Sequence, residues 1–162
     1  MVRVAVDTHV EAPPERVWAV LVDWERQSRW MVDARAVEVL SDRREGVGTR
    51  VRCPTDLFGL VVIEDELEVI EWRQPVLLGV LHTGRLIRGV AAFELDATEH
   101  GTHVRWWEEI EPPLGGLGEL AAPLIEPFVR RVFRRSLAGL KRTVEQHSVR
   151  PDSAPARGAA AS

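Results

Sequence analysis

Hydrophobic and polar residues alternate at the start of the chain. The period-2 pattern over residues 2–10 predicts a strand with one buried face, formed by Val2, Val4, Val6 and Val10. Pro13 and Pro14 follow. Because proline cannot donate to a strand ladder but suits the first turn of a helix, we expect a helix to start near Pro14. Its apolar side chains share one face, and a short second helix carrying tryptophan is expected before residue 31.

Turn signals divide the middle of the chain into further strands. We predict them at residues 34–40, 47–53, 60–72, 76–83, 86–97 and 102–110. Pro54 is expected to close the second of these, because proline lacks the N–H that the ladder needs. The pair Gly84-Arg85 suits a tight two-residue hairpin turn. With the first strand, this gives about seven antiparallel strands.

The longest predicted strand indicates which face of the sheet is buried. Within residues 60–72, Val61, Ile63, Leu67 and Val69 hold odd positions and three glutamates hold even ones, so the odd face is predicted to be inward. The same alternation in the other strands places further residues on inward faces: Val51, Cys53, Phe93, Leu95, Val104, Trp106 and Ile110. These faces should form one apolar surface.

The periodicity becomes helical from Leu117 to about Gln146. Basic residues cover one arc of this helix and apolar residues cover a wider one, which is expected to contact the sheet and a ligand. Pro123 and Pro127 predict a kink or a short preliminary helix. Residues 148–162 contain few bulky apolar groups and are predicted to be a disordered tail. One domain over residues 1–147 remains.

The composition of the chain limits which binding partners and which cellular compartment we expect. The formal net charge of −4 over 162 residues gives no general attraction to nucleic acid or to anionic membranes. The single cysteine, Cys53, excludes an intrachain disulfide and fits a reducing compartment. No signal-peptide pattern and no apolar run of about 18 residues is found, so we expect a cytoplasmic protein without stable membrane insertion.

The order of these features resembles the START-like superfamily, also called SRPBCC or polyketide cyclase/dehydrase-like proteins. After the first strand come A-P-P-E-R-V-W-A-V-L-V-D, a short helix and a strand reading A-R-A-V-E-V-L. The resemblance continues through G-V-G-T-R, H-T-G-R-L-I-R-G, G-T-H-V-R-W and the long C-terminal helix, over about residues 2–146. It implies an α+β helix-grip fold, in which a curved antiparallel sheet wraps around the last helix and two short helices follow strand 1.

Two carboxylates interrupt the apolar inward faces. Asp65 and Glu108 in such surroundings would have raised pKa values and act as general acids or bases near neutral pH. In the alternative, a bulge turns both toward solvent, or each pairs with an arginine such as Arg88 or Arg105. His82 can hydrogen-bond a ligand or shuttle a proton, or can serve the structure alone.

A space between sheet and helix is therefore the predicted ligand site. Its expected lining comes from the strands and the helix: Val51, Cys53, Ile63, Asp65, Leu67, His82, Phe93, Trp106, Glu108, Leu124, Phe128 and Val132. No cofactor or metal is predicted. His100 and His103 lack a third ligand at suitable spacing, and the glycines at 115, 116 and 118 do not follow a phosphate-loop order.

The resemblance implies carriers, sensors or polyketide cyclases. Where the aromatase/cyclases of this superfamily have a cavity Trp and Tyr, this chain has Gln27 and Ala34, and it contains no Tyr at all. We therefore expect first a noncatalytic carrier or sensor of a hydrophobic small molecule, such as a lipid or polyketide. The alternatives are a polyketide cyclase or dehydratase-type enzyme using Asp65, Glu108 or His82, and a protein-interaction module using the outer sheet face and the basic helix stripe.

Overall fold

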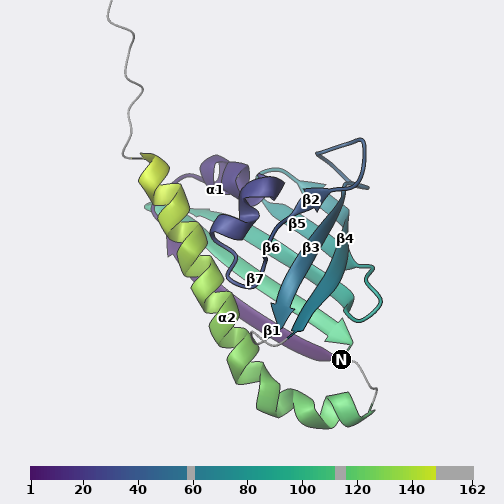
Figure 1. Ribbon diagram of the computed structural model, residues 1–162. Helices are drawn as coiled ribbons and strands as arrows, with labels where there is room; N and C mark the ends of the chain where they lie inside the picture. Colours follow the sequence, from purple (N-terminus) through teal and green to yellow (C-terminus); the bar gives the residue numbers. More distant parts are fainter. Residues whose placement is uncertain (58–60, 112–115, 149–162) are drawn as a thin grey trace, which may run out of the picture.

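A curved seven-stranded antiparallel sheet embraces one long helix in the computed structural model, which describes residues 1–57, 61–111 and 116–148 (Figure 1). The strand order is β1-β7-β6-β5-β4-β3-β2. The predicted α+β helix-grip fold is confirmed. In chain order the elements are β1 (Val2–Val10), α1 (Pro14–Leu21), the 3-10 helix η1 (Trp24–Arg29), β2 (Glu38–Val39), β3 (Arg50–Leu57), β4 (Val61–Arg73), β5 (Leu77–His82), β6 (Arg88–Thr98), β7 (Gly101–Glu111) and α2 (Gly116–Ser148).

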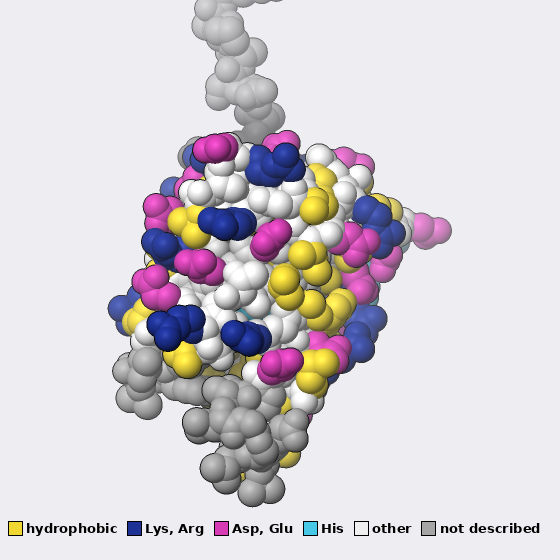
Figure 2. Space-filling model, turned by 90° about the vertical axis from the view of Figure 1, so that its right-hand side faces the viewer, with side chains coloured by type: hydrophobic (Ala, Val, Ile, Leu, Met, Phe, Trp, Pro, Cys, Tyr) yellow, Lys and Arg dark blue, Asp and Glu magenta, His cyan; other side chains and the backbone are white. Residues whose placement is uncertain are grey.

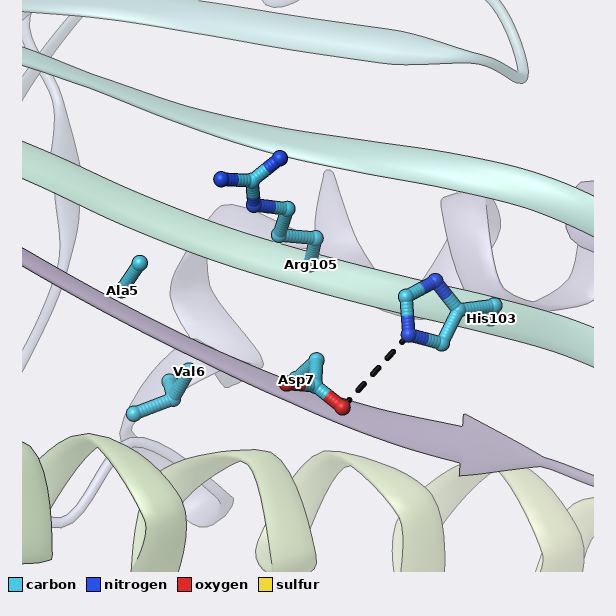
Figure 3. Close-up of a pocket in the computed structure, with 5 residues that line it drawn as sticks. All are labelled: Ala5, Val6, Asp7, His103 and Arg105. Carbon is cyan, nitrogen blue, oxygen red and sulfur yellow. Dashed lines mark ion pairs between the residues drawn. The ribbon is translucent and has the colours of Figure 1, made fainter.

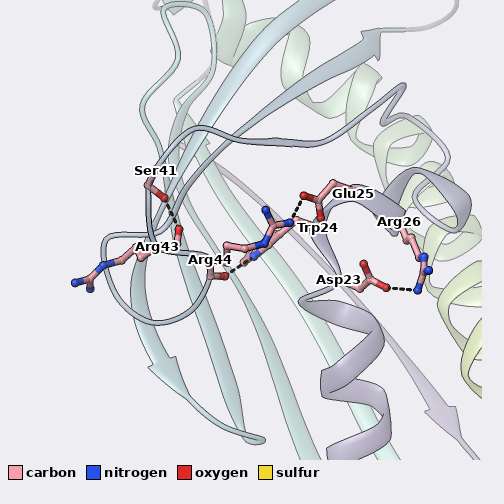
Figure 4. A network of polar contacts seen from close by, with 7 residues as sticks. All are labelled: Asp23, Trp24, Glu25, Arg26, Ser41, Arg43 and Arg44. Atoms are coloured by element: carbon pink, nitrogen blue, oxygen red, sulfur yellow. Dashed lines mark hydrogen bonds and ion pairs between the residues drawn. The ribbon is translucent and has the colours of Figure 1, made fainter.

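The two short helices after β1 form where the sequence predicts them. Pro14 begins α1, which buries Val17, Trp18 and Leu21. The second is a 3-10 helix, and the buried Trp24 in it donates its indole N–H to the carbonyl oxygen of Arg44 over 2.9 Å. Figure 4 shows this bond beside the ion pair between Arg44 and Glu25, which together hold η1 against the loop before β3.

The inward parity predicted for β4 is confirmed. Asp65 and Val69 are buried, whereas Val62 and Ile70 on the other face are exposed. A bulge between Val69 and Glu71 then shifts the register. After the bulge, the next inward residue is Trp72. Its ring packs edge-on against the ring of Trp18, with centroids 5.1 Å apart.

Pro54 does not close β3, and this prediction is wrong. The strand continues to Leu57, with Pro54 opposite Glu64 of β4. The Pro54 carbonyl accepts from the Arg35 N–H at 3.0 Å, so the proline nitrogen lies on that same edge, away from β4, and no bond to β4 is lost. The strand predicted at 34–40 is shorter: β2 is two residues, and Ala34 forms an isolated bridge with Thr55.

The predicted two-residue turn at Gly84-Arg85 is also wrong. β5 ends at His82 and β6 begins at Arg88, so five residues join them. Gly84 is buried instead of forming a tight turn, and a Cβ built there would lie 3.2 Å from Asp65 Oδ1. A two-residue connection does join β6 to β7, through Glu99-His100.

The long helix packs on the sheet through its second half. Phe133, Leu137, Leu140 and Val144 are buried, and both Pro123 and Pro127 lie inside the first half of α2. Figure 1 shows these first turns bending away from the axis of the rest. Arg130 and Lys141 reach β1, donating to the carbonyl oxygens of Ala5 (3.4 Å) and His9 (2.8 Å).

The predictions of a disordered tail and of no membrane insertion remain to be compared with the described residues. The predicted disordered tail lies, apart from its first residue, outside the described residues. No described helix combines the length and hydrophobicity that a membrane span requires.

Candidate functional site

A stack of three aromatic rings joins the sheet to α2. Phe93 of β6 stacks on Trp106 of β7 with ring centroids 5.0 Å apart, and Trp106 stacks on Phe133 of α2 at 3.9 Å. Trp30 meets Phe93 edge-on at 6.3 Å, and all four residues are buried. Side chains therefore fill the interior at this level of the sheet.

A buried ion pair lies further along the strands, where β5 ends. His82 Nδ1–H donates to Asp65 Oδ2 over 2.8 Å, and the two side chains are only 7% and 6% exposed. Antiparallel pairing of β4 with β5 places Leu67 opposite His82, so Asp65 lies one inward position beyond it. The second polar atoms of the pair, His82 Nε2 and Asp65 Oδ1, have no hydrogen-bond partner among the described residues.

Small residues on β6 separate this pair from Glu108. His82 is paired with Gly89, and Ala91 with Glu108, so β6 presents only a hydrogen and a methyl group between β5 and β7. Gly89 has a φ of 147°, and a Cβ there would overlap the carbonyl oxygen of Glu109. A larger residue at position 89 is therefore excluded by the backbone itself.

The pKa of the Glu108 carboxyl lies close to neutral pH. Its pKa is raised from 4.5 to about 7, mainly by burial; the charge of His82 opposes this shift, and the charges of Asp33 and Asp65 add to it. Close to pH 7 such a group can both donate and accept a proton. The pKa of His82 is raised as well: burial alone would lower it, but the hydrogen bond to Asp65 and the nearby carboxylates outweigh that effect.

Two more groups complete the polar cluster, which we define as Asp33, Cys53, Asp65, His82 and Glu108. Cys53 lies opposite Asp65 in the β3–β4 register, and burial raises the pKa of its thiol to about 12, so the thiol stays protonated. Burial also raises the pKa of Asp33, and its Oδ1 lacks a described partner. Asp33 was not predicted; it lies before β2, in a segment without periodicity that the Ala34–Thr55 bridge brings to the sheet.

The residues predicted to line the ligand site differ in their exposure to solvent. Phe128 is 45% exposed and Leu124 is 83% exposed, so these two helix residues are not enclosed with the rest. They lie beside the two prolines, where α2 bends. The strand residues and Val132 are buried or partly buried on the inward side: Val51, Cys53, Ile63, Asp65, Leu67, His82, Phe93, Trp106 and Glu108.

The arginines considered as partners for the carboxylates lie elsewhere. Arg105 is 3.8 Å from Glu94 on the outer face of the sheet, and Arg88 is exposed. Gln27 is buried and donates its side-chain N–H to the carbonyl oxygen of Leu21 over 2.7 Å. That bond gives Gln27 a structural role beside α1.

A surface pocket of about 360 Å³ lies across β1 and β7 (Figure 3). It is lined by Ala5, Val6, Asp7, His103 and Arg105. The His103–Asp7 ion pair within it spans 3.5 Å between exposed side chains, and solvent screening leaves such pairs weak. Within the described part of the chain, no three His, Cys, Asp or Glu side chains are arranged to hold a metal.

Comparison with known proteins identifies a matching family and several solved structures of similar fold. The family model for "Polyketide cyclase / dehydrase and lipid transport" matches residues 1–145. None of the curated proteins compared matches the chain.

Three solved structures illustrate the likeness of fold. The protein TTHA0849 from Thermus thermophilus has a TM-score of 0.79 at 23% identity, over 91% of this chain and 99% of that one. The Zhui aromatase/cyclase from Streptomyces sp. R1128 has 0.75 at 19%, over 94% and 98%. A START superfamily protein from Mycobacterium smegmatis has 0.72 at 15%, over 90% and 98%. At these identities the likeness shows the fold alone.

Proposed function

Because the chain belongs to the polyketide cyclase/dehydrase and lipid transport family and has the START-like fold, we propose that it binds a hydrophobic small molecule between the concave sheet face and α2. In this proposal it acts as a carrier or sensor, and the ligand is a lipid, a polyketide or a similar molecule. The observation that carries the proposal is the polar cluster on an otherwise apolar inward face. Ligand sites are typically apolar with a few oriented polar groups.

The unpartnered atoms of the cluster support this function. Buried polar atoms in native proteins are almost always hydrogen-bonded. His82 Nε2, Asp65 Oδ1 and Asp33 Oδ1 are all buried without a hydrogen-bond partner among the described residues. A bound molecule with a polar end would supply partners to them, while its apolar part contacts residues such as Leu67 and Val132.

An enzyme of the cyclase or dehydratase type is the second candidate. Glu108, with its pKa near 7, suits general acid–base catalysis, and the His82–Asp65 pair beside it suits proton transfer. The Zhui aromatase/cyclase shares the fold. Against aromatase chemistry, Gln27 is used within the structure, and the chain has no Tyr.

A protein-interaction role has less support. Figure 2 shows that acidic and basic side chains are interspersed on the viewed side, without a patch of one charge. Arg130 and Lys141, from the basic side of α2, are engaged with β1 carbonyls.

The proposal is tested with a hydrophobic fluorescent dye and with native mass spectrometry of protein purified from its own host. We expect dye binding, and a copurifying molecule that displaces the dye. Ala91→Phe would place a ring between His82 and Glu108 and should abolish binding. Val90→Phe, on the outer face of the same strand, is the matched control and should bind normally.

Two results decide between the candidates. Absence of dye binding by the folded wild-type protein, or equal binding by both variants, contradicts the proposal. Circular dichroism checks that each variant is folded. A bound molecule recovered unchanged after incubation favours the carrier, whereas its conversion to a dehydrated or cyclised product favours the enzyme.

A further inference from the structure

We propose that the polar end of the ligand is a hydrogen-bond donor without negative charge, an alcohol or an amine, which contacts Asp65, His82 and Glu108, and that carboxylate ligands are rejected. This inference rests on the proposed function, because it specifies the class of molecule bound between the sheet and α2. It concerns the charges and the free hydrogen-bonding atoms of the polar cluster.

Acidic groups outnumber basic ones in the polar cluster. The cluster contains three carboxyl groups, on Asp33, Asp65 and Glu108, and one imidazole, on His82. Even a protonated His82 balances only one carboxylate. A ligand carboxylate placed there would add a further negative charge to a buried site where like charges repel strongly.

Two basic side chains near this part of the sheet, Arg52 and Arg35, have other partners. Arg52 of β3 lies on the outer face, within 3.5 to 3.7 Å of three glutamates. Arg35 pairs with Asp56 at 2.9 Å. Among the described residues, no Lys or Arg contributes to the shifted pKa values of Asp33, Cys53 or Glu108. The negative charge of the cluster is therefore not offset from outside it.

Several hydrogen-bonding atoms of the polar cluster remain free to bind a ligand. Asp65 Oδ1 and Asp33 Oδ1 are acceptors without a described partner, and so they need a donor from the ligand. His82 Nε2 is likewise free while its Nδ1–H is committed to Asp65. An alcohol donates to one of these oxygens, and an ammonium group donates to several while balancing their charge.

The indole N–H of Trp106 is a hydrogen-bond donor on the same inward face of the sheet. Trp106 Nε1–H is buried two residues from Glu108 on β7, and its hydrogen bonding toward that carboxyl favours the charged form of Glu108. A hydroxyl group both donates and accepts, so it can accept from this N–H and donate to a carboxylate in the same site. A carboxylate ligand can accept from Trp106 but cannot donate to Asp65 or Asp33.

The test compares three ligands with the same ten-carbon chain: decanol, decylamine and decanoate. Each competes with the dye for the full chain at pH 7, below its critical micelle concentration. We expect decanol and decylamine to displace the dye at concentrations about tenfold or more below decanoate, since one unit of unfavourable pKa interaction corresponds to a tenfold change. Decanoate binding as tightly as decanol overturns the inference and leaves the proposed function standing.

A variant links this selectivity to the cluster. Glu108→Gln keeps the shape of the side chain but removes its charge, so discrimination against decanoate should fall several-fold. Glu109→Gln, on the outer face of the same strand, should leave the ratio unchanged. An unchanged ratio in Glu108→Gln contradicts the role of the cluster. Failure of the dye and all three ligands to bind the folded wild-type protein contradicts the proposed function itself.

Discussion

The ring of Phe133 lies parallel to that of Trp106, with centroids 3.9 Å apart and planes inclined by 9°. Trp106 belongs to the sheet and Phe133 to the packed half of α2, so this contact fixes the helix at one level of the concave face. The polar cluster lies further along the strands, and the exposed Leu124 lies on the bent half of the helix. The stack therefore separates a filled core from the proposed ligand site.

Removing the Phe133 ring should strongly destabilise the fold. Phe133→Ala is expected to lower the free energy of unfolding by about 3–5 kcal/mol, because it deletes a buried aromatic side chain and leaves a cavity. Urea denaturation measures this loss. Phe128→Ala, at an exposed position on the same helix, is the control and should cost less than about 1 kcal/mol. Equal losses for the two variants would show that the stack does not anchor α2.

Gly139 should resist replacement by alanine. In an unobstructed helix, Gly→Ala stabilises by about 1 kcal/mol. Here a Cβ at position 139 would lie 2.5 Å from the carbonyl oxygen of Trp30, so α2 or the end of η1 must move. We expect Gly139→Ala to lower stability by about 1–3 kcal/mol. Thermal unfolding gives the sign, and a raised melting temperature would refute the close approach.

The sequence predicted most of the fold because the strand and helix periods are regular. Alternation over residues 60–72 placed Asp65 inward, and Pro14 marked the start of α1. Pro54 misled the prediction of β3, because whether a proline ends a strand depends on which edge its nitrogen faces. That edge is set by the pairing with Arg35, which no local pattern of residues reveals.

Stability should depend on pH through Glu108. Its pKa is about 7 in the folded chain against 4.5 ordinarily, so between these values the folded state binds more protons than the unfolded state. Stability from this group is therefore present at low pH and is lost as the pH rises toward 7. The decline is expected to reach about 1.4 kcal/mol per pH unit.

The variant Glu108→Gln isolates this effect. Its carboxamide does not titrate, so the stability of the wild type relative to the variant should fall as the pH rises from 5 to 7. Urea unfolding at several pH values measures the difference. Asp33 and His82 also have raised pKa values; both remain in the variant, where His82 loses the Glu108 charge that helps to raise its pKa. A pH-independent difference would place the Glu108 pKa at its ordinary value.

Replacing Asp65 should change the titration of His82. The hydrogen bond from Nδ1 and the adjacent negative charge raise the His82 pKa against the effect of burial. In Asp65→Asn, burial and the charge of Glu108 remain while the Asp65 charge is gone, so the His82 pKa should fall. Nuclear magnetic resonance of the imidazole signals follows this change directly. Asp56→Asn, at the Arg35 ion pair, should leave His82 unaffected.

The placement of the Asp65–His82 pair relative to Glu108 could not be predicted from the sequence, although each residue was singled out. A two-residue turn at Gly84-Arg85 would place Ile87 opposite His82, whereas the observed partner is Gly89. The longer loop changes which β6 residues lie between β5 and Glu108. The small side chains there, on which the cluster depends, follow from that register.

The contacts of Arg130 and Lys141 with β1 also bear on how copies of this chain behave toward one another. β1 is an edge strand, and an exposed edge can recruit a strand from another molecule and begin aggregation. The two side chains already donate to the Ala5 and His9 carbonyl oxygens. At the opposite edge, β2 is only two residues long, and Pro54 removes one donor from the strand beside it. Both edges of the sheet are thus poor templates for strand addition, which protects the protein against edge-to-edge polymerisation.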